Sequence, residues 1–330
     1  MTDSNLQTEL FRQIKAAVPP HISAVDEIAE LLGVGYDSVY RRIRGEKPVT
    51  LNELKLLCDH FQLSLDDVLQ LHTSKVLFTD MEAVEPVTNF SAYLNTILTQ
   101  LKFFNSFNHR QILYLSKDVP VFYFFYSKEL TAFKSFFWSK SILNDSAFAN
   151  QNFSLQKFNA DKFFELGQQI IIEYNKIPCS ELWNYESINS TVLQIQYYKD
   201  AGIFESVDDL NKVVNSCHDM LNHLQQQVEK GHKFLPGDKQ ADYGQAVKMY
   251  INEIILGNNS ILVETDETKT AIINHIVLKY ISTTDAKFVS RAFANFNNLV
   301  SRSMLISETG EKERVKFFKA LHEKIEGCRK

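Results

Sequence analysis

The sequence predicts a mainly α-helical protein, with five short helices at the N-terminus, a helical middle region and a small α+β unit at the C-terminus. Three observations predict this class. Apolar residues recur every three or four positions through most of residues 1–232. Ser, Thr, Gly and Pro stand where these predicted helices begin and end. After residue 243 shorter apolar runs, separated by turn-forming residues, favour strands instead.

The first 72 residues predict five helices, each with its own start or stop signal. Pro19 ends the first helix because proline lacks the amide hydrogen. Ser23 is a predicted N-cap, and Thr50 with Glu53 predicts a capping box. The expected ranges are 6–18, 23–33, 36–44, 50–61 and 64–71, the last opened by Ser64 with Asp67. We expect residues 1–72 to form a self-contained domain.

The remainder is expected to contain a linker and two further regions. Residues 73–86 are mixed and acidic, which is typical of a linker. Residues 87–232 predict a helical, aromatic-rich region, and residues 233–330 the small α+β unit. The expected helices are 90–107, 120–126, 128–143, 160–175, 187–199, 207–230, 286–301 and 311–325. The expected strands are 249–256, 260–264 and 270–275, joined by turns at 257–259 and 266–268.

Composition limits the classes of function. The chain has 330 residues and a formal net charge of -5, so any DNA binding must come from a local basic patch. The four cysteines form no CxxC pair, which argues against zinc and against a disulfide framework. We expect no metal and no cofactor. The sequence shows neither a signal peptide nor a long apolar run, and therefore predicts a cytoplasmic protein without membrane contact.

The spacing of small and apolar residues in 29–45 predicts a helix-turn-helix. Such a motif needs a small residue where its two helices cross, and Ala29 supplies it. It also needs a residue that tolerates a left-handed turn, which is Gly33. Val39 is the apolar residue expected to hold the second helix against the rest of the domain. That second helix, predicted at 36–44, would be the recognition helix.

These segments resemble the phage-repressor/Cro family of transcriptional regulators, also called XRE-type. The resemblance covers about 65 residues and is carried by 29–34 (AELLGV), 38–41 (SVYR), 44–45 (RG) and 63–68 (LSLDDV). Arg42 stands where the family often has an apolar or aromatic residue. The resemblance implies major-groove recognition of double-stranded DNA. The base-reading residues would be Gly35, Tyr36, Asp37 and Tyr40, and the phosphate contacts Arg41, Arg42, Arg44 and Lys47.

The local charge agrees with this assignment, although the domain as a whole is acidic. Residues 1–72 hold seven Lys or Arg against eleven Asp or Glu, whereas residues 36–47 hold four basic residues against Asp37 and Glu46. So few phosphate contacts predict weak binding by one domain. We therefore expect a homodimer that reads two half-sites.

Two further patterns leave alternatives open. Seven residues of the helix at 207–230 are spaced three and four apart, which fits either a dimer seam or a helix packed inside the chain. They are Val207, Leu210, Val214, Cys217, Leu221, Leu224 and Val228. The aromatic residues from Phe103 to Trp138 fit either a core or a ligand pocket. His218 and His223 are five apart and make a poor metal pair.

The sequence therefore predicts a sequence-specific transcriptional regulator. Its C-terminal region would dimerise and could sense a small-molecule or protein effector. The alternative is an antitoxin-like or scaffold protein whose helix-turn-helix is secondary. No nucleophile elbow, P-loop, GxGxxG or HExxH motif is present, so the sequence proposes no enzymatic reaction.

Overall fold

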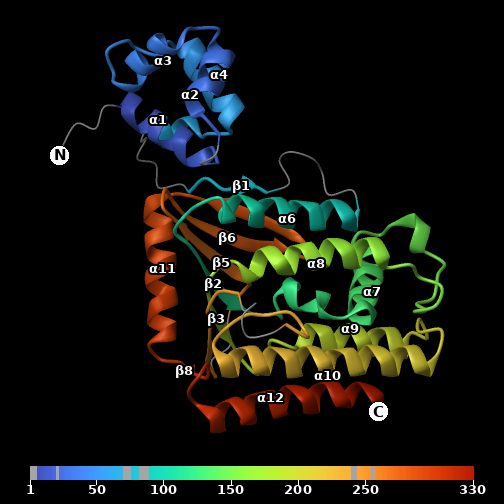
Figure 1. The fold of residues 1–330 in the computed structure, drawn as a ribbon. Helices are drawn as coiled ribbons and strands as arrows, with labels where there is room; N and C mark the ends of the chain where they lie inside the picture. Colours follow the sequence, from blue (N-terminus) through green and yellow to red (C-terminus); the bar gives the residue numbers. More distant parts are fainter. Residues whose placement is uncertain (1–5, 20–21, 70–75, 82–88, 239–243, 254–256) are drawn as a thin grey trace.

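The computed structural model describes residues 6–19, 22–69, 76–81, 89–238, 244–253 and 257–330. The N-terminal helices form one body, and the rest of the chain is built around a single large sheet (Figure 1). The two parts have separate hydrophobic cores. Each core forms where the apolar faces of its own elements meet, because burial of apolar surface drives packing.

Five helices form the N-terminal body. They are α1 (Leu6–Ala17), α2 (Ala24–Leu32), α3 (Tyr36–Ile43), α4 (Leu51–Phe61) and α5 (Leu65–Val68). Leu10, Ile14, Ile28, Val39 and Leu57 are each 1% exposed or less and form the centre of their core. The five predicted helices are thus confirmed.

The predicted turns and caps of this body are present as well. The Ser23 hydroxyl accepts a hydrogen bond from the Asp26 amide. Gly33 ends α2 with φ 62°, the left-handed conformation that glycine adopts without strain. Thr50 and Glu53 form the complete capping box. The predicted partner of Ser64 is Asp67, whose side chain lies outside the described part of the chain.

Residues after 76 contribute eight described strands to one mixed sheet. These are β1 (Thr79–Asp80), β2 (Arg110–Ser116), β3 (Cys179–Trp183), β4 (Val247–Ile251), β5 (Ser260–Thr265), β6 (Lys269–Ile276), β7 (Lys279–Thr283) and β8 (Met304–Leu305). Their order is β1-β7-β6-β5-β2-β3-β4-β8. Strands β2, β3 and β4 are parallel, and every other pairing is antiparallel. Parallel neighbours need long crossovers, which the helices between them provide.

Helices cover the two faces of this sheet unequally. On one face lie α6 (Phe90–Asn105), α7 (Lys128–Phe137), α8 (Asp161–Asn175), α9 (Asn189–Asp200) and α10 (Val207–Lys230), with α12 (Glu311–Glu326) packed on α10 (Figure 1). Short 3-10 or π segments accompany them at η1 (Val121–Tyr126), η2 (Trp138–Ile142), η3 (Ser146–Phe148) and η5 (Gly327–Arg329). On the other face α11 (Ala286–Val300) packs through Val289, Phe293 and Phe296. That second face therefore has a thinner cover.

The predicted fold class, mainly α with a small α+β unit, is wrong for this part of the chain. The sheet combines strands from both sides of residue 232, so the helical region and the small unit are one α/β assembly. The predicted hairpin through 257–259 is also wrong, because β2 and β3 lie between β4 and β5. Strand β1 falls within the predicted linker 73–86, most of which lies outside the described residues.

Other predicted elements agree with the structure. Each helix predicted after residue 86 has a helical counterpart, although 120–126 is a 3-10 helix and the end of 128–143 a π-helix. The turn at 266–268 joins β5 to β6, as predicted. Residues 254–256, predicted as the end of a strand, lie outside the described chain.

The regular apolar stripe of α10 is part of the core. Leu210, Val214, Leu221 and Val228 are buried, whereas Val207, the first residue of the stripe, is 72% exposed. Since these side chains contact α7, α12 and the sheet within one chain, the prediction of a dimer seam on this helix is wrong. The packed-helix alternative is confirmed. The aromatic residues between Phe103 and Trp138, apart from Phe107, likewise belong to the core or pack against it.

Candidate nucleic-acid interface

The predicted recognition helix, α3, separates its residues into an inward and an outward face. Val39 is completely buried and packs in the N-terminal core, as predicted. Tyr36 and Tyr40 are 58% and 48% exposed, which is unusual for large aromatic side chains. Asp37 is exposed between them, and Gly35 is the exposed N-cap of the helix. The predicted base-reading residues therefore share one accessible surface.

Three of the four predicted phosphate-binding cations are also exposed. Arg41, Arg44 and Lys47 follow one another at the end of α3 and in the loop after it. Glu46 lies among them, with its carboxylate 2.6 Å from Arg44 Nε and 3.8 Å from Arg41 Nε. Exposed ion pairs of this kind contribute little free energy. Both guanidinium groups can therefore exchange Glu46 for a phosphate.

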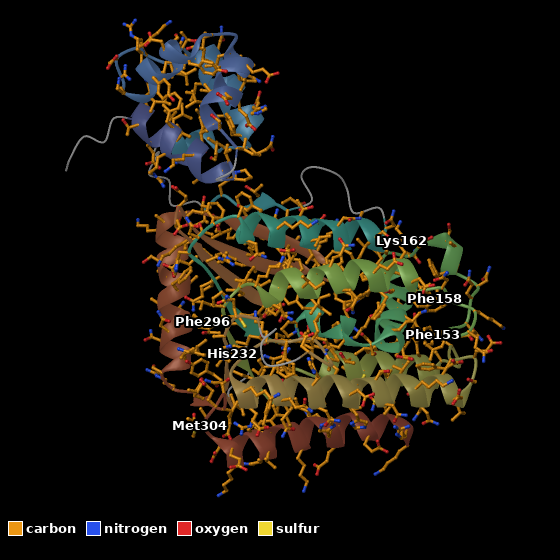
Figure 2. All side chains as sticks on the ribbon, viewed as in Figure 1. Phe153, Phe158, Lys162, His232, Phe296 and Met304 are labelled. Carbon is orange, nitrogen blue, oxygen red and sulfur yellow. The ribbon has the colours of Figure 1, made fainter. Side chains whose placement is uncertain are left out.

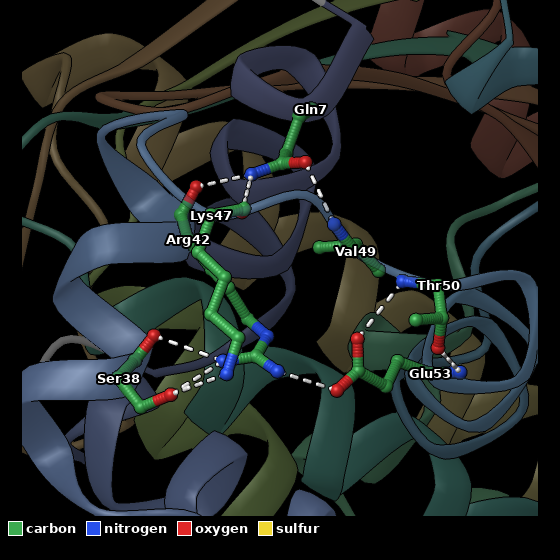
Figure 3. Close-up of polar contacts among 7 residues, drawn as sticks. All are labelled: Gln7, Ser38, Arg42, Lys47, Val49, Thr50 and Glu53. Carbon is green, nitrogen blue, oxygen red and sulfur yellow. Dashed lines mark hydrogen bonds and ion pairs between the residues drawn. The ribbon is translucent and has the colours of Figure 1, made fainter.

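Arg42 does not belong to this exposed set, and its predicted role as a phosphate contact is not compatible with its position. Its side chain is 3% exposed and points into the domain (Figure 3). Nη1 donates to Ser38 Oγ at 2.6 Å and to the Ser38 carbonyl at 3.1 Å. Nη2 donates to Glu53 Oε1 at 2.6 Å. Arg42 thus connects α3 to the capping box of α4.

A second polar connection holds the end of α3 to α1. The Gln7 amide nitrogen donates to the carbonyls of Arg42 and Lys47, at 2.6 and 2.8 Å. Its oxygen accepts from the Val49 amide at 2.9 Å (Figure 3). We call Gln7, Ser38, Arg42 and Glu53 together the α3 clasp. Sequence reasoning missed it, although Arg42 at a usually apolar position and the Thr50–Glu53 pair were its visible signals.

The clasp changes the charge of the predicted DNA-binding surface. Arg42 is paired with Glu53 inside the domain, so three exposed cations remain against Asp37 and Glu46. This surface is less positive than the sequence of 36–47 suggests. Specific contacts by the tyrosines would therefore have to supply a larger share of any binding energy.

A buried polar network lies inside the sheet body. Glu181, in the middle of β3, is completely buried. Its carboxylate accepts from the hydroxyls of Tyr123 and Tyr174, each at 2.5 Å, and from Trp183 Nε1 at 2.7 Å. Burial raises the pKa of the neighbouring Cys179 to about 12, which keeps its thiol protonated. Because these groups satisfy one another away from solvent, the network is structural.

Two histidines and a glutamate lie close together where α10 packs on α12. His218 Nδ1 lies 2.7 Å from Nδ1 of His322, and its Nε2 lies 3.1 Å from Glu326. His223 instead contacts the carbonyl of Phe234. Within the described residues no group of three His, Cys, Asp or Glu side chains could hold a metal ion. None of the described helices is both long and apolar enough to cross a membrane.

Comparison with known proteins identifies no relative. No family model, no curated protein and no solved structure matches this chain.

Proposed function

We propose that this chain is a sequence-specific, DNA-binding transcriptional regulator of the cytoplasm. The observation that carries the proposal is the exposed surface of α3, where Tyr36, Asp37 and Tyr40 lie together at the start of the helix. An α-helix fits the major groove, and residues of its first turns reach the base edges. The α3 clasp supports the proposal, because a reading helix needs a fixed orientation.

Each exposed residue would have a distinct role. Tyr36, Asp37 and Tyr40 would contact base edges and give sequence preference. Gly35 would let the backbone approach DNA closely, since no atom lies within 4 Å of the position of a Cβ there. Arg41, Arg44 and Lys47 would neutralise phosphates and give affinity independent of sequence. We further propose that the protein is a homodimer, because one such surface makes few phosphate contacts. We also propose that it has no enzymatic activity.

The test is binding of the full chain to random duplex DNA, measured by fluorescence anisotropy over a range of salt concentrations. We expect affinity to fall as salt rises. In the double variant Arg41→Ala/Arg44→Ala, the slope of log affinity against log salt should shrink by about 2 for each bound domain. The matched control is Lys55→Ala, an exposed cation on α4. If wild type, double variant and control all fail to bind DNA, the scaffold alternative replaces this proposal.

A further inference from the structure

Helix α12 is joined to α10 by buried apolar side chains and by a small polar cluster. Side chains of the two helices fill the layer between them (Figure 2). Leu321 and Ile325 of α12 are completely buried in the core that the two helices share. His322 and Glu326 of α12 instead contact His218 of α10. We call His218 and His322 the imidazole pair.

The two rings of the imidazole pair point at each other. Nδ1 of His218 lies 2.7 Å from Nδ1 of His322. The ring centres are 5.0 Å apart, and the ring planes differ by 18°. The distance between the centres exceeds the distance between the nitrogens by about the width of one ring, so both nitrogens lie on the line that joins the centres. This is the geometry of an in-plane N–H···N hydrogen bond.

Such a bond holds one proton between the two nitrogens. A neutral imidazole has one donor nitrogen and one acceptor nitrogen, whereas a charged imidazole has two donors. Hydrogen bonds from Arg329 and His218 lower the pKa of Glu326, which keeps this carboxylate ionised. Nε2 of His218, 3.1 Å from Glu326, is therefore a donor, because an ionised carboxylate only accepts. Nδ1 of neutral His218 is then the acceptor, and Nδ1 of His322 is the donor.

The neutral pair tolerates one additional proton but not two. The first can bind to Nε2 of His322, and the hydrogen bond between the rings is kept. The second places a hydrogen on both Nδ1 atoms, which then repel each other. Burial lowers the pKa of His322, and the charge of His218 lowers it further. The folded chain thus favours the neutral ring, so this contact stabilises it fully above about pH 6.5, the ordinary value for histidine, and progressively less below.

The charged groups around the imidazole pair come from α9, α10, α12 and η5. They are Glu326 and the Lys319–Glu323 ion pair of α12, Asp219 of α10, Arg329 of η5 and Lys199 of α9. Arg329 also donates to Asn215 of α10, and Lys199 donates to the carbonyl of Cys328. These two contacts do not depend on the histidines. Protonation of both Nδ1 atoms therefore loosens the end of α12 without releasing the whole helix.

Two buried groups on α7 and α10 also change charge when the pH falls. Burial lowers the pKa of Lys134 on α7 to about 7. Burial likewise lowers the pKa of His223 on α10. A test of the imidazole pair must therefore compare variants in which Lys134 and His223 are both unchanged.

We propose that the imidazole pair is an acid-sensitive latch between α10 and α12. It holds the last turns of α12 while one proton lies between the rings, and it opens when both Nδ1 atoms are protonated. The aligned contact of the two rings carries this inference, which is independent of the proposed function in DNA binding.

The positions of the protons are tested by long-range ¹H–¹⁵N NMR spectra of the full chain, labelled at its histidines. At pH 7.5 we expect His218 to carry its proton on Nε2 and His322 on Nδ1. The His322→Gln variant assigns the signals. On acidification the wild-type pair should take up protons in two separate steps. If both rings carry their proton on Nε2, or if the pair titrates in a single step, the latch is wrong.

Opening of the latch is tested by hydrogen exchange of the α12 amides at pH 7.5 and 5.5, corrected for the intrinsic rate at each pH. In wild type, protection of residues 318–326 should fall by about tenfold on acidification, the effect of one lost hydrogen bond. His322→Gln removes one titrating ring and keeps a hydrogen-bonding side chain, so its protection should change little.

The matched control is His275→Gln, which replaces an exposed histidine of β6 and should behave as wild type does. An equal loss of protection in wild type and in His322→Gln would overturn the proposal, since the change would then come from Lys134, His223 or another group that both chains share.

Discussion

At the scale of residues, the α3 clasp shows why a charged side chain can occupy the interior of a small domain. Removing a guanidinium group from water is costly unless its donors find acceptors. Nη1 and Nη2 of Arg42 find them in Ser38 and Glu53, whereas its buried Nε has no partner among the described residues. Burial opposes ionisation of Glu53, yet its pKa lies below the usual value because Arg42 and the Thr50 amide bond to the carboxylate. The contacts with Arg42 and Thr50 therefore favour the ionised form of Glu53.

The first prediction follows from this pairing. Arg42→Ala leaves Glu53 without its cation and should destabilise the N-terminal body by about 3 kcal/mol. Hydrogen exchange of the α3 amides in the full chain should accelerate by roughly a hundredfold if they exchange by unfolding of this body. Arg41→Ala is the matched control, because Arg41 is exposed on the same helix. Equal exchange in both variants would show that the clasp does not stabilise α3.

A second prediction concerns the outward side of the same helix. Tyr36→Ala and Tyr40→Ala each remove an exposed side chain, so they should leave the stability of the domain nearly unchanged. Each should reduce discrimination between the preferred DNA site and random DNA by about 1–3 kcal/mol. A selection of bound genomic fragments, followed by competition binding, measures this difference. Retention of wild-type sequence preference by both variants would contradict the assignment of the reading face.

The sequence could predict part of this site and not the rest. The exposure of Tyr36 and Tyr40 follows from helical periodicity once Val39 is placed inward. The inward position of Arg42 does not, because it depends on Glu53 of the next helix and on Gln7 of the first.

At the scale of elements, helices were predictable, and the parallel strands β2 and β3 were not. Helical spacing and caps are local, so residues such as Ser23, Gly33 and Thr50 mark helix ends directly. Strand β3 is short and contains Ser180 and Glu181, yet all of its five residues are buried. Its partners β2 and β4 lie across long crossovers, and Glu181 is tolerated only because distant tyrosines donate to it. No pattern within the five residues of β3 indicates that β2, β4 and these tyrosines are its neighbours.

The buried stripe of α10 gives a third prediction, with a matched pair of variants on one helix. Leu221 is completely buried, so Leu221→Lys places a charge in the core and should lower the melting temperature sharply. Val207 belongs to the same stripe but is 72% exposed, so Val207→Lys should melt as wild type does. Thermal unfolding measures the melting temperature of each variant, and light scattering measures its oligomeric state. A folded, stable Leu221→Lys monomer from a dimeric wild type would restore the dimer-seam hypothesis.

At the scale of the whole molecule, the proposed DNA binding would have to overcome an unfavourable overall charge. The chain carries a net charge of -5, and the N-terminal body has its own core, separate from that of the sheet. The three exposed cations around α3 are therefore the main local attraction for phosphates. One body of this kind makes a small contact with DNA, and symmetric pairs of such modules are the common solution.

The last prediction is that the protein binds its site as a homodimer and that two independent measurements agree on this. Light scattering should give twice the chain mass of 38.1 kDa at micromolar concentration. Six phosphate contacts from two bodies should give a slope of log affinity against log salt of about -5, whereas three from one body give about -3. A monomer with the shallower slope would contradict dimerisation while leaving DNA binding intact. A dimer with the shallower slope would mean that only one α3 surface reaches the DNA. The slope is proportional to the number of phosphates contacted, because each contact releases counterions.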